Sequence, residues 1–186
     1  MRKLKLLFIV GSLRKDSYNK KLAHVAASKL ETDHEVSFLP MEEFIMPLMN
    51  QDIEKQYTKE IDNLNAKINA VDGVVVTSPE YNGSIASPLK NFIDWTSRTK
   101  TPAWNLKPVL LLAASPGALG GVRGLAVTRF TLETLGAHVY PEMFGLQKAH
   151  EAFDADNKMI DAKTKERVDG LTAKFLTFVA QMANNK

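Results

Sequence analysis

The loop from Gly11 to Asn19, GSLRKDSYN, combines several hydrogen-bond donors with a guanidinium group. Ser12, Ser17 and Asn19 supply hydroxyl and amide donors, and Arg14 supplies a positive charge. A helix is predicted to begin near the end of this loop, and the first N–H groups of a helix are free to bind an anion. A terminal phosphate ester carries nearly two negative charges and three acceptor oxygens, so it needs many donors at once. The loop therefore predicts a phosphate site.

The same residues also allow a simpler interpretation. Ser17 and Asn19 would then only cap the helix, and Arg14 would be solvated. Two common kinds of nucleotide loop are disfavoured. The loop lacks the G-x-G-x-x-G spacing of dinucleotide-binding folds, and it lacks the G-K-[ST] ending of a triphosphate-binding loop.

Two further loops carry residues suited to a flat ligand. The loop TSPEYNGSIAS (77–87) would present backbone N–H and C=O groups to the hydrogen-bonding edge of a flavin, through Pro79, Glu80, Tyr81, Asn82, Gly83 and Ser84. The loop ASPGALGGVRG (114–124) offers a donor in Ser115 and allows close approach of its backbone at Gly117, Gly120, Gly121 and Gly124. For this last loop, an ordinary glycine-rich turn is the alternative.

Apolar runs of strand length alternate with helical patterns, which is typical of a parallel sheet covered by helices. Strands are predicted at residues 4–10, 36–39, 73–77, 108–114 and 138–140. The runs at 74–76 and 109–114 are continuous, as in strands buried on both faces, so these two strands should be central. Five such strands fit one doubly wound α/β sheet, in which ligands bind outside the carboxyl ends of the strands. The three loops should therefore meet at one edge.

Helical spacing of apolar residues predicts the elements between the strands. The first helix has apolar residues at i, i+3, i+4 and i+8 from Leu22, and either Asp16 or Ser17 is its N-cap. A second helix is predicted around residues 55–71. The last helix should cover the sheet with one apolar stripe, which consists of Val168, Leu171, Phe175, Phe178, Val179 and Met182.

The boundaries of two more helices are marked by proline and glycine. One helix should begin with Ser87 as its N-cap and Pro88 as its first residue, where the missing N–H of proline has no cost. The other is predicted over residues 125–135 and should close at Gly136, since glycine is favoured just after a helix.

The composition restricts the class of protein. The 186 residues are 45% hydrophobic, which suits a single domain over residues 1–186. The net charge of +3 is too small to indicate nucleic-acid binding. Because the chain has no cysteine, disulfides, thiolate nucleophiles and thiolate metal sites are excluded, and a reducing, cytoplasmic location is expected. The apolar runs are too short for a membrane span, and the run at residues 6–10 is too short for a signal peptide.

Acidic residues and histidines give no metal site. Asp154, Asp156 and Asp161 lack the glycine and the glutamate of a calcium-binding loop, so a solvated turn is expected there. The four histidines are scattered without the spacing of metal ligands. We therefore predict that the protein binds no metal.

Two tryptophans and a methionine-rich segment have alternative roles. Trp95 and Trp104 are candidates for stacking on a substrate, although Trp95 lies on an apolar helix stripe and fits the core. Met41, Met46 and Met49 suit an adaptable interface between subunits, although core packing is the commoner use of methionine.

Two segments, GSLRKDSYNKKLA and SPEYNGSIASPLKNFIDW, are similar to a known family. They resemble the NADPH-dependent FMN reductase family of flavodoxin-like proteins, which includes chromate, quinone and azo-dye reductases. The resemblance extends over essentially the whole chain, since PLMNQDIE (47–54) and FDADNKMID (153–161) also look like family segments. It implies a flavodoxin-like, doubly wound, five-stranded parallel sheet in the order 2-1-3-4-5 with helices on both faces.

The resemblance also implies a cofactor, a reaction and an assembly. FMN would be bound, with its phosphate on Ser12, Arg14, Ser17 and Asn19, its isoalloxazine along residues 79–84 and its pyrimidine side near residues 115–121. NADPH or NADH would deliver hydride to flavin N5 and leave before a small acceptor such as a flavin, quinone, azo compound or chromate takes the electrons, in ping-pong kinetics. Such chemistry requires no catalytic side chain. A homodimer or homotetramer, with each flavin near a subunit boundary, is also implied.

A flavodoxin-type electron carrier is the rival hypothesis, since it binds FMN but oxidises no nicotinamide. Such carriers are typically acidic and use a T-G-x-T phosphate loop, whereas this chain is basic and uses Arg14. Two other doubly wound classes fail on single residues. A low-molecular-weight phosphotyrosine phosphatase needs a cysteine in the first loop, and a response-regulator receiver needs an aspartate where Thr77 stands.

Overall fold

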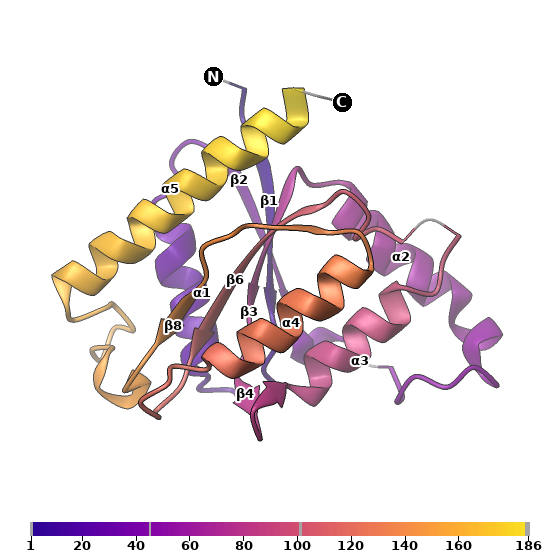
Figure 1. Cartoon of the computed structure of the whole chain (residues 1–186), viewed down its shortest axis with the longest axis horizontal. Helices are drawn as coiled ribbons and strands as arrows, with labels where there is room; N and C mark the ends of the chain where they lie inside the picture. Colours follow the sequence, from indigo (N-terminus) through magenta and orange to yellow (C-terminus); the bar gives the residue numbers. More distant parts are fainter. Residues whose placement is uncertain (1, 45, 101, 185–186) are drawn as a thin grey trace.

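A parallel sheet forms the centre of the computed structural model, which describes residues 2–44, 46–100 and 102–184 (Figure 1). Its strands are β1 (Lys5–Val10), β2 (Glu35–Pro40), β3 (Gly73–Thr77), β6 (Pro108–Ala114), β7 (His138–Val139) and β8 (Phe144–Leu146). They lie in the order β2-β1-β3-β6-β7, β8 also pairs with β6, and every pair is parallel. The predicted order 2-1-3-4-5 is confirmed, with β7 and β8 together in the fifth position.

Helices cover both faces of the sheet (Figure 1). One face packs against α1 (Tyr18–Ser28) and α5 (Ala162–Asn184), and the other against α2 (Thr58–Asn69), α3 (Ser87–Thr96) and α4 (Val122–Thr134). Side chains alternate along β1, so that Phe8 belongs to the first core and Ile9 to the second. Every residue of β3 and β6 is buried, which confirms that these two strands are central.

The fifth strand is interrupted, which the sequence pattern did not predict. Pro141 lies between β7 and β8 and has no N–H for a sheet hydrogen bond. Arg129 of α4 binds the interrupted segment, because its guanidinium donates to the carbonyl oxygen of Tyr140 at 2.6 Å and to that of Pro141 at 3.0 Å. The chain re-enters the sheet at Phe144, which pairs with Leu112.

Three predicted helix starts are wrong, and one of them is that of α4, which begins at Val122 rather than at residue 125. The N-cap of α3 is Ala86 rather than Ser87, because β5 (Ser84–Ile85) delivers extended backbone up to Ala86, whose carbonyl oxygen accepts the first helical hydrogen bond from Lys90 at 2.9 Å. Residues 54–57 form a 3-10 turn, η2 (Glu54–Tyr57), so α2 begins only at Thr58. At the end of α4 the prediction holds, since Gly136 takes a positive φ of 83° just after the helix.

Both tryptophans belong to the core. The indole N–H of Trp95 donates to the carbonyl oxygen of Pro47 at 2.8 Å, and that of Trp104 donates to Thr96 Oγ1 at 2.9 Å. Because both side chains are fully buried, neither is available for stacking on a substrate. Met41, in the short 3-10 turn η1 (Met41–Glu43), is also buried in the core, which is the commoner role of methionine.

The described residues show neither a membrane span nor a metal cluster. Within these ranges, no helix is both long and apolar enough to cross a bilayer, and no three acidic, histidine or cysteine side chains gather as metal ligands would. Asp154 instead accepts hydrogen bonds from the backbone of its own turn, at 2.9 Å from Asp156 N and 2.8 Å from Lys158 N.

Candidate functional site

Three loops at the carboxyl edge of the sheet enclose a cavity of about 150 Å³. They follow β1, β3 and β6, and the hairpin after β3 lies at the end of the sheet opposite to the two chain termini (Figure 1). The predicted residues that line this cavity are Ser12, Arg14, Ser17, Asn19, Pro79, Glu80, Tyr81 and Ser115. Tyr18, Ala114 and Pro116 also line it, and although they lie within the quoted loops, Tyr18 and Ala114 were given no role of their own. The structure thus brings the three loops together, as predicted.

The start of α1 presents free donors to this cavity. Ser17, rather than Asp16, is the N-cap, and its Oγ accepts from the backbone N–H of Lys20 at 3.4 Å. Ser12 and Ser17 are buried, whereas the backbone N–H groups of Tyr18 and Asn19 bind no other described residue. A buried hydroxyl pair beside a free helix N-terminus is the arrangement that an anion needs.

Arg14 supplies an unneutralised cation at the mouth of the cavity. Its guanidinium lies 5.7 Å from the centre of the Tyr18 ring and forms no ion pair with a described carboxylate. Tyr18 itself stacks on Phe153, with ring centres 6.5 Å apart and planes 6° from parallel. The guanidinium therefore lies over a ring that is itself stacked, and its N–H groups remain available to a ligand.

Asn19 holds the start of α1 against the sheet. Its Oδ1 accepts from the backbone N–H of Ala114 at 2.9 Å, and its Nδ2 donates to the carbonyl oxygen of Ala114 at 3.0 Å. Both bonds are buried, so they fix the loop after β1 to the end of β6. One amide hydrogen remains, and this residue contributes to the cavity mainly through its backbone N–H and its positioning of the loop.

Thr77, the last residue of β3, contains a buried hydroxyl without a partner. Its Oγ1 has no hydrogen bond among the described residues, while its carbonyl oxygen accepts from the N–H of Gly11 at 2.7 Å. Because side chains alternate along a strand, Thr77 faces the same side as Val75, which is the side covered by α1. A buried hydroxyl left unpaired costs about 1–3 kcal/mol. Thr77 is fully buried and does not itself line the cavity.

The loop after β3 is a hairpin that the sequence analysis did not predict. Strands β4 (Glu80–Tyr81) and β5 pair antiparallel, and Asn82 and Gly83 between them both have positive φ, of 51° and 76°. Asn-Gly is the strongest short signal for such a turn, so the information was present in the sequence. Asn82 and Gly83 lie at its tip outside the cavity, and Ser84 borders a separate surface groove beside α3.

Glu80 connects this hairpin to α4. Its carboxylate accepts from the backbone N–H groups of Arg123 at 3.0 Å and Gly124 at 3.1 Å and forms an ion pair with the Arg123 guanidinium. The side chain of Glu80 is only 8% exposed. Burial raises the pKa of Glu80, but the hydrogen bonds from Arg123 and Gly124 and the charge of Arg123 outweigh it, so the pKa lies below its usual value of 4.5. Glu80 therefore caps α4 as an anion.

Two glycines after β6 are required for close packing of the backbone. A Cβ on Gly120 would lie 2.6 Å from the carbonyl oxygen of Gly145, and one on Gly121 would lie 2.8 Å from the Cβ of Ala113. Both glycines also have positive φ, of 61° and 87°. The backbone N–H of Gly117 donates to Ser115 Oγ at 3.1 Å. None of these glycines lines the cavity, so their predicted contact with a flat ligand stays a prediction.

A model of the NADPH-dependent FMN reductase family matches residues 4–151 of this chain. The chain belongs to the NADPH-dependent FMN reductase family. It is 33% identical over 184 residues to a quinone reductase of Escherichia coli, with 97% of each chain covered. It is 30% identical over 183 residues to a 2-hydroxy-1,4-benzoquinone reductase of Burkholderia, covering 95% of this chain and 96% of the relative.

A solved structure agrees with this assignment. The flavoenzyme NAD(P)H:(acceptor) oxidoreductase FerB of Paracoccus denitrificans superimposes with a TM-score of 0.85 at 30% identity, covering 96% of this chain and 98% of that one. Membership of the NADPH-dependent FMN reductase family confirms the expected flavodoxin-like fold, an oxidoreductase activity, and FMN and NAD(P)H as cofactor and electron donor. The cavity fits the phosphate end of FMN, because free N–H groups, hydroxyls and a guanidinium converge on it.

Proposed function

We propose that this protein binds FMN with its phosphate in the cavity at the start of α1, and that it uses NADPH or NADH to reduce a quinone or a similar small acceptor in a ping-pong cycle. The observation that carries this proposal is the convergence of Ser12, Arg14 and Ser17 on one cavity that also contacts the hairpin after β3. Similarity to two quinone reductases supports a quinone as the acceptor.

The chain's own residues bind and orient rather than react. The cavity of about 150 Å³ is smaller than the roughly 300–1,000 Å³ of sites that enclose a whole ligand, so it suits the phosphate and its adjoining chain. The ring system would lie at the open side, between the hairpin and the loop after β6. When bound, FMN supplies the hydride-accepting and electron-donating chemistry. Glu80, the carboxylate that lines the cavity, is already engaged by Arg123 and Gly124 and is held as an anion, so it is not available as an acid.

Assembly into a homodimer or homotetramer forms part of the same proposal. Phe130 on α4 is 74% exposed and Leu48 is 79% exposed, which is unusual for side chains of this size. Leu48 borders the open groove between α3 and α4, and Val127 of α4 lines the same groove. Contact between two copies of this surface would remove these apolar groups from water and place a second subunit beside the hairpin. A cytoplasmic location remains the prediction from the lack of cysteine.

Anaerobic addition of NADPH to FMN-saturated protein tests the function against the electron-carrier hypothesis. We expect the visible absorbance of the bound flavin to bleach within seconds, and a quinone added afterwards to restore it. Initial rates at several fixed quinone concentrations should then give parallel double-reciprocal lines. A flavin that stays oxidised under NADPH and NADH would show that the protein is an electron carrier, and intersecting lines would exclude the ping-pong cycle.

Thr77→Val tests whether the unpaired hydroxyl forms a hydrogen bond with bound FMN. We expect FMN to bind about threefold to tenfold more weakly, as for the loss of one hydrogen bond, while the apoprotein unfolds at an unchanged or higher free energy. Thr96→Val is the matched control, because the buried Thr96 hydroxyl donates to the carbonyl oxygen of Phe92 at 2.8 Å and accepts from Trp104. This control should destabilise the protein in urea. An equal loss of stability in Thr77→Val, or an unchanged FMN dissociation constant, would contradict the assignment.

A further inference from the structure

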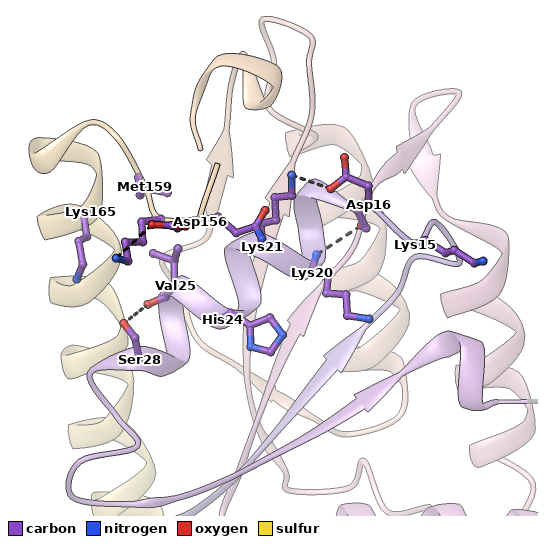
Figure 2. A pocket seen from close by; sticks show the side chains of 13 residues that line it. Lys15, Asp16, Lys20, Lys21, His24, Val25, Ser28, Asp156, Met159 and Lys165 are labelled. Carbon is purple, nitrogen blue, oxygen red and sulfur yellow. Dashed lines mark hydrogen bonds and ion pairs between the residues drawn. The ribbon is translucent and has the colours of Figure 1, made fainter. Parts of the chain in front are cut away.

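A second and larger hollow, of about 690 Å³, lies along the outer face of α1. One helical stripe forms its base, consisting of Ser17, Lys20, Lys21, His24, Val25 and Ser28. The opposite wall comes from residues 156–159 and from Lys165 of α5. Figure 2 shows Val25 and Met159 between Lys165 on one side and Lys20 and Lys21 on the other. We call this hollow the α1 groove.

The α1 groove contains more cations than anions. Five lysines line it, and they are Lys15, Lys20, Lys21, Lys158 and Lys165, whereas Asp16 and Asp156 are its two carboxylates. Four of the lysines are held in ion pairs, and Lys15 forms none with a described carboxylate. The five lysines exceed their four carboxylate partners by one, so the groove keeps a small positive charge after these pairs are counted.

The ion pairs position the ammonium groups and leave N–H donors available on each of them. Lys20 lies 2.8 Å from Glu42, Lys21 lies 2.7 Å from Asp16, and Lys165 lies 2.7 Å from Asp169. An ammonium group has three N–H donors, so each lysine can bind a ligand oxygen while it keeps its carboxylate. Exposed pairs of this kind contribute only about 0–1 kcal/mol each, so sharing them with a ligand costs little.

Two apolar side chains lie among the polar residues of the groove. They are Val25 of α1 and Met159 of the opposite wall, and little of either surface is exposed. The volume falls in the range of about 300–1,000 Å³ that is common for small-molecule sites. Cations beside a small apolar patch, formed by Val25 and Met159, suit a ligand with a compact apolar body and a doubly charged end group.

We propose that the α1 groove is a second ligand site, next to the FMN cavity and sharing only Ser17 with it, for a phosphate ester of mononucleotide size. The phosphate would lie between lysines of α1 and lysines of the opposite wall, and the body of the ligand would lie on Val25 and Met159. Lysine is a common phosphate binder, because it acts as a point charge that several phosphate oxygens can share. The proposal is argued only from the residues of the groove, so it does not depend on the reaction at the flavin.

Calorimetric titration of FMN-saturated protein with adenosine 5′-monophosphate tests the proposal, because FMN blocks the other anion site. We expect a dissociation constant below about 1 mM. Adenosine and inorganic phosphate should each bind at least about tenfold more weakly, since each lacks one of the two contacts, and added salt should weaken the nucleotide. The absence of nucleotide binding, or binding no tighter than that of adenosine or phosphate alone, would overturn the proposal.

A pair of double variants locates the site. Lys20→Gln with Lys158→Gln removes one cation from each wall, and we expect nucleotide binding about fivefold to tenfold weaker. Lys59→Gln with Lys174→Gln removes the same charge from α2 and from another part of α5, and it should change nothing. Flavin reduction by NADPH should be equal in both. An unaffected nucleotide dissociation constant in the first pair, or an equal loss in the second, would show that the lysines of the groove do not bind it.

Arg14→Ala distinguishes loss of binding at the FMN cavity from loss of binding in the α1 groove. Arg14 does not line the α1 groove, so Arg14→Ala should leave the nucleotide dissociation constant unchanged while it weakens FMN binding. Loss of nucleotide binding in Arg14→Ala would instead assign the nucleotide to the FMN cavity and overturn the second site.

Discussion

Arg14→Ala should raise the FMN dissociation constant about 10- to 100-fold, because a charge-assisted hydrogen bond to a dianion contributes roughly 1.5–3 kcal/mol. The guanidinium lies over Tyr18 at the mouth of the cavity and has no carboxylate partner among the described residues. Its loss should therefore weaken ligand binding with little effect on the fold. Fluorescence titration of the apoprotein with FMN measures the change, and a urea melt of the same sample should stay within about 0.5 kcal/mol of the parent protein.

Arg167→Ala is the matched control for this variant. Arg167 is also exposed and lies 5.2 Å from the centre of the Phe144 ring, so it loses the same charge and the same kind of aromatic contact. It lies outside the cavity, and its variant should bind FMN as the parent protein does. Equal FMN dissociation constants for the parent and Arg14→Ala, or equal weakening in both variants, would remove Arg14 from the phosphate site.

Glu80→Ala should lower the free energy of unfolding by about 2 kcal/mol, because it removes the carboxylate that accepts from two N–H groups in the first turn of α4, together with an ion pair whose carboxylate is nearly buried. For a chain of this length, that loss corresponds to a decrease of roughly 4–8 °C in melting temperature. FMN binding should weaken as well, since the hairpin that lines the cavity loses its connection to α4. Differential scanning calorimetry and the FMN titration measure the two effects.

The pH dependence of the free energy of unfolding tests whether Glu80 stabilises the fold through its charge. Because the pKa of Glu80 lies below its usual 4.5 in the folded protein, its ionised form stabilises the fold fully above pH 4.5. This contribution is lost as the pH falls through the lowered pKa. Glu80→Gln should therefore be less stable than the parent protein above pH 4.5, and the difference should shrink at lower pH. A difference that stays constant or grows on acidification would contradict this role.

Arg123→Ala is the control for the helix cap. The Arg123 side chain is 61% exposed, and its removal leaves the two backbone N–H groups bonded to Glu80. We expect a loss of only about 0.5 kcal/mol, as for an exposed ion pair. An Arg123→Ala variant as unstable as Glu80→Ala would show that the stabilisation comes from the ion pair and not from the backbone hydrogen bonds to Glu80.

The sequence predicted those elements whose cause is local. Strands at 73–77 and 108–114 agree with the structure residue for residue, because a strand buried on both faces is an uninterrupted apolar run. The three loops were predicted to meet because the carboxyl ends of parallel strands share one edge. Ser17 as a cap and Gly136 as a helix end follow from the same kind of local signal.

Elements that depend on distant residues were missed. Helix α4 begins at Val122, three residues before the predicted start, because N–H groups of its first turn are bound by the carboxylate of Glu80, 43 residues away from Arg123 in the chain. Gly120 was predicted to approach a flat ligand, yet its lack of a side chain is needed for contact with Gly145 of β8, a strand that the pattern did not show. The bonds from Asn19 to Ala114 span 95 residues, so a residue predicted only as a phosphate donor also positions the loop.

The central claim is that the turn between β1 and α1 binds a terminal phosphate, and the direct test compares FMN with riboflavin, which lacks only that group. Titration of the same apoprotein with both flavins should give at least about 100-fold tighter binding of FMN, and Arg14→Ala should reduce this ratio without changing riboflavin affinity. Equal dissociation constants for the two flavins would contradict the account.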